Sequence, residues 1–386
     1  MSDLIECQRD LFTIPRDITY LNCANMGPQL RSATAAGLEA VHANSAPWLR
    51  TPRDWFTGPE RLRSLAARLM NADADSVALV PSVSYGIAIA ASNLPVGAGQ
   101  SIVVLDQQFP SNVYAWRELA RRSGAQVRTV LRDANAGWTD ALLAAIDSRT
   151  AVVAVPNCHW ADGGHVHLER VAAAARGVGA SLVVDATQSL GAYPLDVGAL
   201  RPDFLVAAGY KWLLGPYGLG YLYVAPRWRS EGIPLEHSWL ARAGSDDFAR
   251  LTRYTDEFRS GARRFDVGEC SQFTTLPIAA AALEQVLSWG VPRIQRSLAA
   301  LTDRLAAGAE QIGATALSPT HRVGHLIGIR MPSSPDARLA QALAAARVYV
   351  SIRGDYVRVS PYLYNDAGDI DRLIAVLAEL TTNRAT

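Results

Sequence analysis

The sequence contains few cysteines and no excess of charge of either sign. The four cysteines, at positions 7, 23, 158 and 270, lie far apart and form no C-x-x-C pair. This argues against a zinc site or a disulfide framework and favours a reducing, cytoplasmic location. The formal net charge is +1 with 19% charged residues, which argues against a basic surface for nucleic acid. We therefore expect no metal site and no nucleic-acid partner.

Long apolar runs are also missing. No apolar stretch approaches the roughly 20 residues that span a bilayer. The first residues, MSDLIECQRDLF, include acids and no apolar core segment, so we expect neither a membrane span nor a signal peptide. Repeats and low-complexity segments are absent as well. With 386 residues, the chain is long enough for a large core and two lobes.

Short apolar runs alternate with longer stretches of helical spacing through most of the chain. Runs typical of buried strands occupy 76–81, 101–105, 126–131 and 151–155. Helical spacing occupies 31–44, 58–71, 139–146 and 168–179. This alternation predicts an α/β fold with a largely parallel sheet. After residue 276 the pattern predicts helices and then short strands, which is typical of a smaller α+β lobe. A short helix is also predicted from Leu4 to Leu11.

The central stretch, residues 181–224, places two ionisable residues at the ends of predicted strands. Asp185 follows the run Leu182-Val183-Val184, and Lys211 follows the run 204–208. Ligands of open α/β sheets lie outside the carboxyl ends of the strands. A lysine there can form a Schiff base with an aldehyde, and a carboxylate can keep a ring nitrogen protonated. Together they favour pyridoxal 5'-phosphate (PLP) as cofactor, whereas either residue alone would be read as a turn former or a surface lysine.

The segments D-A-T-Q-S-L-G-A-Y-P-L-D-V and Y-K-W-L-L-G-P-Y-G-L-G-Y-L-Y-V within this stretch resemble the class V aminotransferase family of fold-type I PLP enzymes. This family includes cysteine desulfurases, kynureninases, isopenicillin N epimerase-like proteins and C–S lyases. The resemblance implies that Lys211 carries the cofactor, with Tyr210 beside it. It also implies that Asp185 pairs with the pyridine nitrogen and that Gln188 lies near the ring hydroxyl. For the fold, it implies a large PLP-binding domain (21–265) and a small domain (1–20 and 266–386).

Four further positions correspond to cofactor contacts of the family, although the residue at one of them, Trp160, departs from the family pattern. Val83 and Ser84 begin a predicted helix, whose free N–H groups suit a phosphate, although Ser84 is also typical of an ordinary cap. Phe109 falls where the family stacks a ring on the cofactor; desulfurases have histidine there and kynureninases have Phe-Pro, as here. Trp160 stands where many relatives carry an asparagine near the PLP hydroxyl, and the bulky indole is expected to line the pocket.

The predicted substrate contacts are Arg358 and Asn25. Arg358 lies in Y-V-R-V-S-P-Y-L-Y-N-D, which resembles the family's terminal signature, and its planar fork of donors suits an α-carboxylate. Asn25, in Y-L-N-C-A-N-M-G-P, faces substrate or simply forms a turn. His159 and Asp162 are read either as proton carriers or as a structural, hydrogen-bonded pair.

One departure from the family pattern concerns the partner subunit. Relatives carry Gly-Thr near Gly268, which contacts the phosphate held by the other subunit. Here Glu269 and Cys270 follow the glycine. Ser271 is a weak substitute for the missing threonine. Arg263 and Arg264 either contribute to the active site or form an ion pair at the subunit interface.

The resemblance implies a homodimer that acts on a small α-amino acid through an external aldimine and a Cα carbanion. Phe109 and the absence of cysteine from residues 335–356 argue against a desulfurase. A β-cleaving lyase, of the C–S lyase or kynureninase kind, is therefore the favoured reaction. Epimerisation and transamination share its first step and stay open, as does a PLP-binding protein without catalysis.

Overall fold

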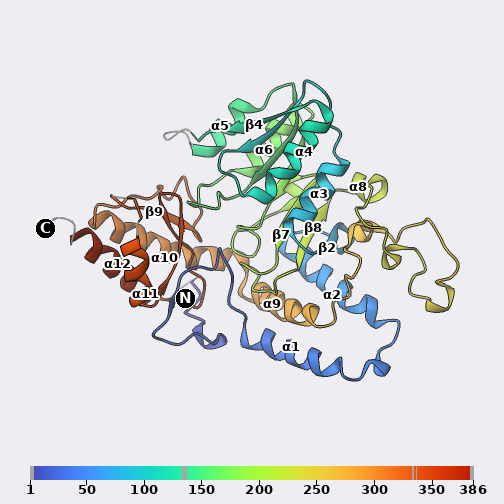
Figure 1. Ribbon diagram of the computed structural model, residues 1–386, viewed down its shortest axis with the longest axis horizontal. Helices are drawn as coiled ribbons and strands as arrows, with labels where there is room; N and C mark the ends of the chain where they lie inside the picture. Colours follow the sequence, from blue (N-terminus) through green and yellow to red (C-terminus); the bar gives the residue numbers. More distant parts are fainter. Residues whose placement is uncertain (1–3, 133–136, 333, 336, 383–386) are drawn as a thin grey trace.

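The apolar runs of the first two thirds of the chain form one large sheet (Figure 1). The computed structural model describes residues 4–132, 137–332, 334–335 and 337–382. Within them the sheet has seven strands in the order β2-β8-β7-β6-β5-β3-β4. Only β8 runs antiparallel to its neighbours. The predicted α/β fold with a mainly parallel sheet is confirmed. In chain order the strands are β2 (Val77–Val80), β3 (Ser101–Leu105), β4 (Gln126–Val130), β5 (Thr150–Pro156), β6 (Ser181–Asp185), β7 (Phe204–Ala208) and β8 (Gly220–Val224).

Helices cover both faces of this sheet because its strands are apolar on both sides, as parallel strands usually are. In β7, Phe204 and Val206 belong to the core with α3 and α4, whereas Leu205 and Ala207 belong to the core with α2 and α6. The helices of the large lobe are α1 (Arg31–Ala43), α2 (Asp54–Leu69), α3 (Val83–Asn93), α4 (Tyr114–Ser123), α5 (Gly137–Ala145), α6 (Leu168–Gly177), α7 (Val197–Leu200), α8 (Pro226–Glu231) and α9 (Thr275–Trp289). Among them, α9 packs on α1 and α2.

A second, smaller lobe combines β1 from the start of the chain with the elements from α10 onward, which are drawn in orange and red in Figure 1. Its antiparallel sheet has the order β11-β12-β9, and a two-stranded parallel ladder pairs β1 with β10. The predicted α+β character is confirmed. Its elements are β1 (Thr19–Tyr20), α10 (Val291–Gln311), β9 (Ile327–Arg330), α11 (Ala337–Ala345), β10 (Val348–Tyr349), β11 (Ser351–Arg353), β12 (Tyr356–Val359) and α12 (Ala367–Thr382).

The predicted helix from Leu4 to Leu11 is wrong. Only Arg9–Leu11 form a single 3₁₀ turn. Contacts with the small lobe hold the segment instead: the Ile5 N–H donates to Ser297 Oγ (2.9 Å), and the Gln8 N–H donates to the Leu363 carbonyl (2.7 Å). These long-range bonds override the local helical spacing, which a short segment is too weak to impose by itself.

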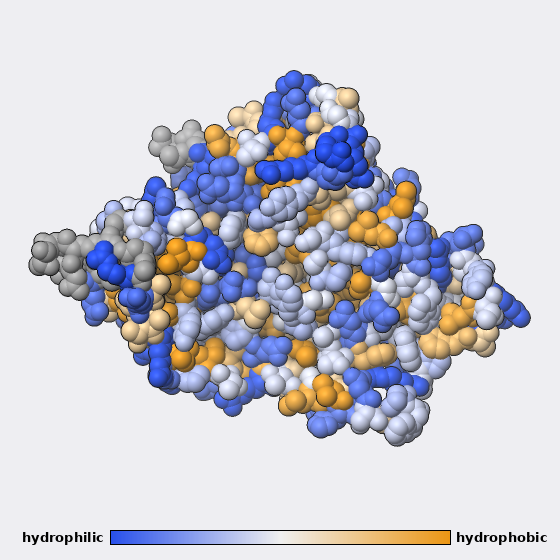
Figure 2. All heavy atoms as spheres, viewed as in Figure 1, coloured by the Kyte–Doolittle hydropathy of each residue, from blue (hydrophilic) through white to orange (hydrophobic). Residues whose placement is uncertain are grey.

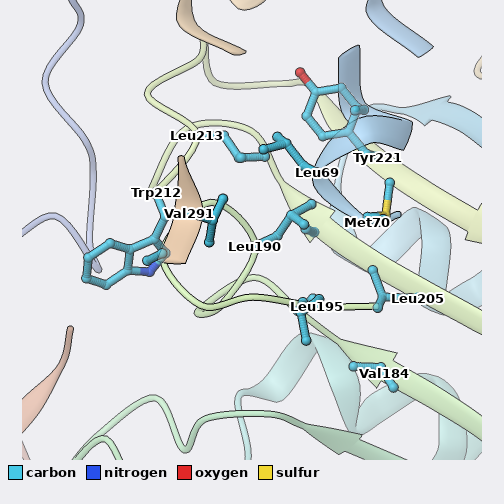
Figure 3. Packing of buried hydrophobic residues seen from close by; sticks show 14 of the residues in the cluster. Leu69, Met70, Val184, Leu190, Leu195, Leu205, Trp212, Leu213, Tyr221 and Val291 are labelled. Carbon is cyan, nitrogen blue, oxygen red and sulfur yellow. The ribbon is translucent and has the colours of Figure 1, made fainter. Parts of the chain in front are cut away.

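The turn after β7 is anchored in the core through Trp212. Its indole is fully buried and donates from Nε1 to Gln188 Oε1 (2.9 Å). Figure 3 shows Leu213 and Leu190 among the packed side chains of the same cluster, with Val291 from α10. Residue 211 therefore lies between a rigid strand and a rigid core anchor.

Beneath β2 a buried ion pair ties the large lobe to the segment after η7 (Gly261–Phe265). Arg63 donates through both terminal nitrogens to Asp266 (2.9 and 2.5 Å), and both residues are buried. Asp266 also accepts from the Leu79 N–H (2.8 Å). This pair fixes the strand that leads into α3.

Apolar side chains also lie on the surface over α1 and the turn that follows it. Leu38, Val41, Trp48 and Leu49 are all more than half exposed, and Figure 2 shows apolar groups along the lower edge of the molecule, where α1 runs. In the part of the chain that the structure describes, no helix has both the length and the apolar character needed to cross a bilayer.

Candidate active site

A cavity of about 200 Å³ lies at the carboxyl ends of β6 and β7, beside the start of α3. Its position agrees with the rule that ligands of α/β sheets bind outside these strand ends. All eight of the predicted cofactor residues line it. They are Val83, Ser84, Phe109, Trp160, Asp185, Gln188, Tyr210 and Lys211.

Lys211 is held in this cavity by the backbone turn that follows β7. The Gly215 N–H donates to the Gly209 carbonyl (2.8 Å), and the Leu214 N–H donates to the Lys211 carbonyl (3.1 Å). The Lys211 side chain is only 5% exposed. The amine is therefore placed by a closed turn and not by a flexible loop.

Burial is the main cause of a lowered pKa at Lys211, which falls from 10.5 to about 8. An ammonium group loses hydration when it is buried, and this loss favours the neutral amine. Asp185 opposes the shift, and the positive charge of Arg358 adds to it. The neutral form, which is the one that attacks a carbonyl, is thus far more populated near neutral pH than it is in an ordinary lysine.

Lys211 is also the only lysine among the 37 lysine and arginine residues of the sequence. Any Schiff base with a lysine of this chain must therefore form at position 211. The composition alone therefore points to position 211, without any motif.

Asp185 ends β6 and is buried. Its Oδ1 accepts from the Thr187 N–H (3.0 Å). Burial raises the pKa of the Asp185 carboxyl, and the hydrogen bonds from Thr187 oppose that shift. A cationic ring nitrogen at this position would supply the counter-charge that the buried carboxylate lacks.

Gln188 lines the same wall with its amide already oriented. Its Nε2 donates to the Ala24 carbonyl (3.1 Å), and its Oε1 accepts from Trp212 (2.9 Å). His325 adds a bond from its Nε2 to the Gln188 carbonyl (2.6 Å). One Nε2 hydrogen remains for a ligand; its predicted contact with a ring hydroxyl stays a prediction.

The start of α3 offers two unused backbone donors. Ser82 caps the helix: its Oγ accepts from the Tyr85 N–H (3.1 Å), and its carbonyl accepts from the Gly86 N–H (3.2 Å). A helix start leaves its first N–H groups without intrahelical partners, and those of Val83 and Ser84 are among them. The Ser84 hydroxyl donates to Ser111 Oγ (3.1 Å), and both serines line the cavity. Free N–H groups and hydroxyls at a helix start suit a phosphate.

Two aromatic rings form another wall. Phe109 is 38% exposed, and its ring centroid lies 5.4 Å from Lys211 Nζ. Trp160 meets the Phe109 ring edge to face at 5.4 Å and donates from Nε1 to the Gln107 carbonyl (2.7 Å). Tyr210 packs on Tyr217, at 4.6 Å between centroids. The open face of Phe109 is available for a planar ring to stack on it.

Arg358 lies behind Trp160 on β12 and is only 2% exposed. It donates to the Trp160 carbonyl (3.1 Å) and to Ser351 Oγ (3.3 Å), and its Nε has no partner. Burial lowers the pKa of Arg358 to about 10, and the nearby Arg353 adds to this effect. Within the described residues this buried guanidinium has no carboxylate partner, so its unused donors suit an anionic ligand.

Asn25 does not belong to the cavity wall. It is exposed, and its N–H donates to the Asn22 carbonyl in a turn (3.0 Å). Its neighbours approach the site instead: the Ala24 carbonyl holds Gln188, and the Gly27 N–H donates to the Tyr210 carbonyl (2.8 Å). The contact of Asn25 with substrate stays a prediction.

His159 and Asp162 form a buried pair outside the cavity wall. His159 Nδ1 lies 3.2 Å from Asp162 Oδ1, and the imidazole stacks on Trp138 at 5.0 Å. The imidazole Nε2 lies 3.3 Å from the Asp106 carbonyl. Both ring nitrogens are thus engaged, which supports the structural reading of this pair.

The other polar candidates also have partners away from the cavity. Arg263 pairs with Glu60 (2.6 Å) and Asp75 (2.6 Å), and Ser271 donates to the Trp55 carbonyl. Arg264 donates to two backbone carbonyls, those of residues 230 and 232. Gly268 donates its N–H to Glu236 (2.6 Å), so a carboxylate lies beside this glycine.

Cys158 lines the cavity, although its sequence context gave no sign of it. The thiol is buried, and burial raises its pKa well above the usual range. It is therefore protonated at neutral pH. Only the register of the loop after β5 brings it there, and that register could not be read from the sequence.

The cavity fits PLP on three independent observations. A buried lysine with a lowered pKa lies at one strand end, and at the next lies a buried carboxylate that forms no ion pair within the described residues. Backbone donors at the start of α3 face the same space. No cluster of three or more metal-ligating side chains occurs in the described residues.

Comparison with known proteins gives matches along nearly the whole chain. Residues 53–373 match the family model Aminotransferase class-V. Isopenicillin N epimerase of Streptomyces clavuligerus is 28% identical over 94% of this chain and 95% of its own. Kynureninase of Deinococcus radiodurans is 28% identical over 97% of this chain and 93% of its own.

Among solved structures, the apo structure of cysteine desulfurase from Thermococcus onnurineus NA1 superposes with a TM-score of 0.86 at 20% identity. The match covers 98% of this chain and 99% of that chain. It shows a common fold, so the predicted fold-type I architecture is confirmed.

Proposed function

Because the chain belongs to the aminotransferase class-V family, we propose that it is a lyase that cleaves a bond at the β-carbon of an α-amino acid. The family makes it a PLP-dependent enzyme, and PLP is its cofactor. The reaction type, the roles of single residues and the assembly are our inference from the site.

The proposal assigns three parts of the cavity to the cofactor. Lys211 would hold its aldehyde carbon, Asp185 its ring nitrogen, and the start of α3, with Ser84, its phosphate. When bound, the protonated ring stabilises negative charge at the substrate Cα. Phe109 would cover the ring and keep water away from that carbon.

Side chains of the protein then bind the carboxylate of the substrate and remove the proton from its Cα. The Arg358 guanidinium grips the substrate carboxylate, because its fork of donors matches two carboxylate oxygens. The Lys211 amine takes the Cα proton. Its pKa of about 8 suits this task, since a general base works best when its pKa lies near the operating pH.

The observation that carries β-cleavage is that Lys211 is the one amine base on the described wall of the cavity. Its described lining includes one amine, that of Lys211, and no histidine. Removal of a β-substituent needs one base to take the Cα proton, whereas inversion at Cα by two groups needs a second acid on the other side. Phe109 and Trp160 have no proton to supply at neutral pH. The Cys158 thiol and the Tyr210 hydroxyl are weak acids, because burial raises the pKa of each group.

The thiols argue against sulfur transfer. A desulfurase needs a nucleophilic thiolate. Cys158, on the cavity wall, is buried with a raised pKa, and residues 335–356 contain no cysteine. Kynureninase among the relatives agrees with cleavage at the β-carbon.

An amino-acid panel tests the proposed reaction. Purified holoenzyme is incubated with S-substituted cysteines, with kynurenine and with alanine, which has no leaving group; products are identified by mass spectrometry. We expect a released thiol, or alanine from kynurenine, and no cleavage of alanine itself. Substrate recovered with an inverted Cα, or a keto acid that retains its whole side chain, would refute β-cleavage in favour of epimerisation or transamination. Lys211→Ala is the inactive control.

We also propose that the protein is a cytoplasmic homodimer. The exposed apolar side chains on α1, including Leu38 and Val41, suit a subunit contact, and Trp48 and Leu49 extend that surface. All four cysteines are free, which suits a reducing compartment. Light scattering after size exclusion checks the assembly: a monomer at micromolar concentration contradicts it. Cell fractionation checks the location.

A further inference from the structure

Two arginines approach the same indole from one β-hairpin. In the β11–β12 pair, Ser351 faces Arg358 and Arg353 faces Tyr356. Arg353 lies two residues from Ser351, which faces Arg358, so the side chains of the two arginines are on one face of the hairpin. The Cζ atoms of Arg353 and Arg358 lie 5.6 and 5.8 Å from the Trp160 ring centroid.

Arg353 has no acidic partner within the described residues. It donates from Nη1 to the Ile352 carbonyl (2.8 Å), and this bond leaves most of its donors unused. The guanidinium is half-buried. A half-buried cation without a counter-charge is costly unless a ligand supplies one.

A second cavity, of about 510 Å³, lies on the Arg353 side of Trp160. Its wall continues that of the first cavity along the chain: Gln107 and His159 line the second, and Gln108 and Trp160 line the first. The indole of Trp160 therefore stands between the cavity that contains Lys211 and the more polar space that contains Arg353.

Three carboxylates line this second cavity, and two of them form ion pairs with an arginine. Asp162 pairs with Arg132, and Asp355 pairs with Arg330 (3.4 Å). Asp106 also lines the cavity, but no bond joins its carboxylate to Arg353 in the described structure. The unmatched cation of this space is Arg353.

We propose that Arg353 binds a second carboxylate, at the far end of the substrate side chain, and so selects dicarboxylic α-amino acids. The proposal rests on the proposed function, because Arg358 is taken to hold the α-carboxylate and Arg353 the distal one. Arg353 is close enough to lower the pKa of both Lys211 and Arg358, which places it within electrostatic reach of both groups.

Carboxylates without an amino group, which are not substrates, test this subsite directly on the holoenzyme. Succinate, glutarate and adipate are compared with butyrate by isothermal titration calorimetry. We expect the best dicarboxylate to bind roughly tenfold tighter than butyrate or better, since hydrogen bonds to a charged partner contribute that much. In Arg353→Gln the ratio of the two affinities should fall to near one, and Arg353→Lys should restore only part of it, because a point charge lacks the fork.

Arg330→Gln is the matched control, since Arg330 lines the same cavity but is paired with Asp355; its affinity ratio should equal that of the parent. Equal affinity for dicarboxylates and butyrate in the parent overturns the proposal and leaves the proposed function standing, as does an unchanged ratio in Arg353→Gln. Absence of product from every amino acid, with the dicarboxylate preference intact, overturns the proposed function alone.

Discussion

The lowered pKa of Lys211 gives the most specific electrostatic prediction. The shift from 10.5 to about 8 corresponds to a penalty of roughly 3 kcal/mol on the buried ammonium. At pH 7 about 10% of the chains would carry the neutral amine, against about 0.03% for an ordinary lysine. Capture of an aldehyde at neutral pH should be faster in proportion.

Two single charges should move this pKa in opposite directions. Asp185 stabilises the ammonium, so Asp185→Asn should lower the Lys211 pKa further. Arg358 destabilises it, so Arg358→Gln should raise the pKa. Apoprotein grown with ¹³C-lysine gives one Cε signal to follow by NMR, because the chain has one lysine. A parent midpoint near 10.5, or two shifts of the same sign, would refute the electrostatic account of the site.

Three further substitutions probe separate parts of the account. Phe109→Leu should weaken PLP binding by about 1 kcal/mol, the value of a lost aromatic pair, and Phe109→Trp should weaken it less; equal dissociation constants in fluorescence titrations would place the stacking ring elsewhere. Arg358→Ala should keep PLP bound but weaken amino-acid binding by roughly 2–5 kcal/mol, read from substrate-induced changes in absorbance; unchanged affinity would move the carboxylate site to another residue. Arg63→Ala should destabilise the fold by roughly 3–5 kcal/mol, since it leaves Asp266 buried and unpaired; a urea midpoint equal to that of the parent would show that the pair is not stabilising.

Much of the fold was predictable because the strands are short apolar runs with clear ends. The run 204–208 became β7 with the same limits, and 101–105 became β3. Lys211 and Asp185 were predictable for the same reason: a polar residue directly after a buried strand lies at the sheet edge where ligands bind. The Leu4–Leu11 segment failed because its partners, such as Ser297, are almost 300 residues away.

The parts of the site that the sequence could not supply depend on loop register. Cys158 follows β5, and only the backbone path shows that it lines the cavity with the predicted Trp160 while His159 turns to Asp162. No motif in the sequence marked Arg353 as a site residue. The role proposed for Arg353 depends on the pairing of β11 with β12, which places it beside Trp160. It also depends on the lack of an acidic partner for Arg353 within the described residues.

The central claim is that the cofactor aldehyde is held by Lys211. Its most direct test is borohydride reduction of the PLP-loaded protein, followed by peptide mass analysis. The account predicts one pyridoxyl label, on the peptide that contains Lys211, and none in Lys211→Ala, which has no lysine left. A stable PLP complex that borohydride does not trap at Lys211, or a label that persists in Lys211→Ala, would contradict it.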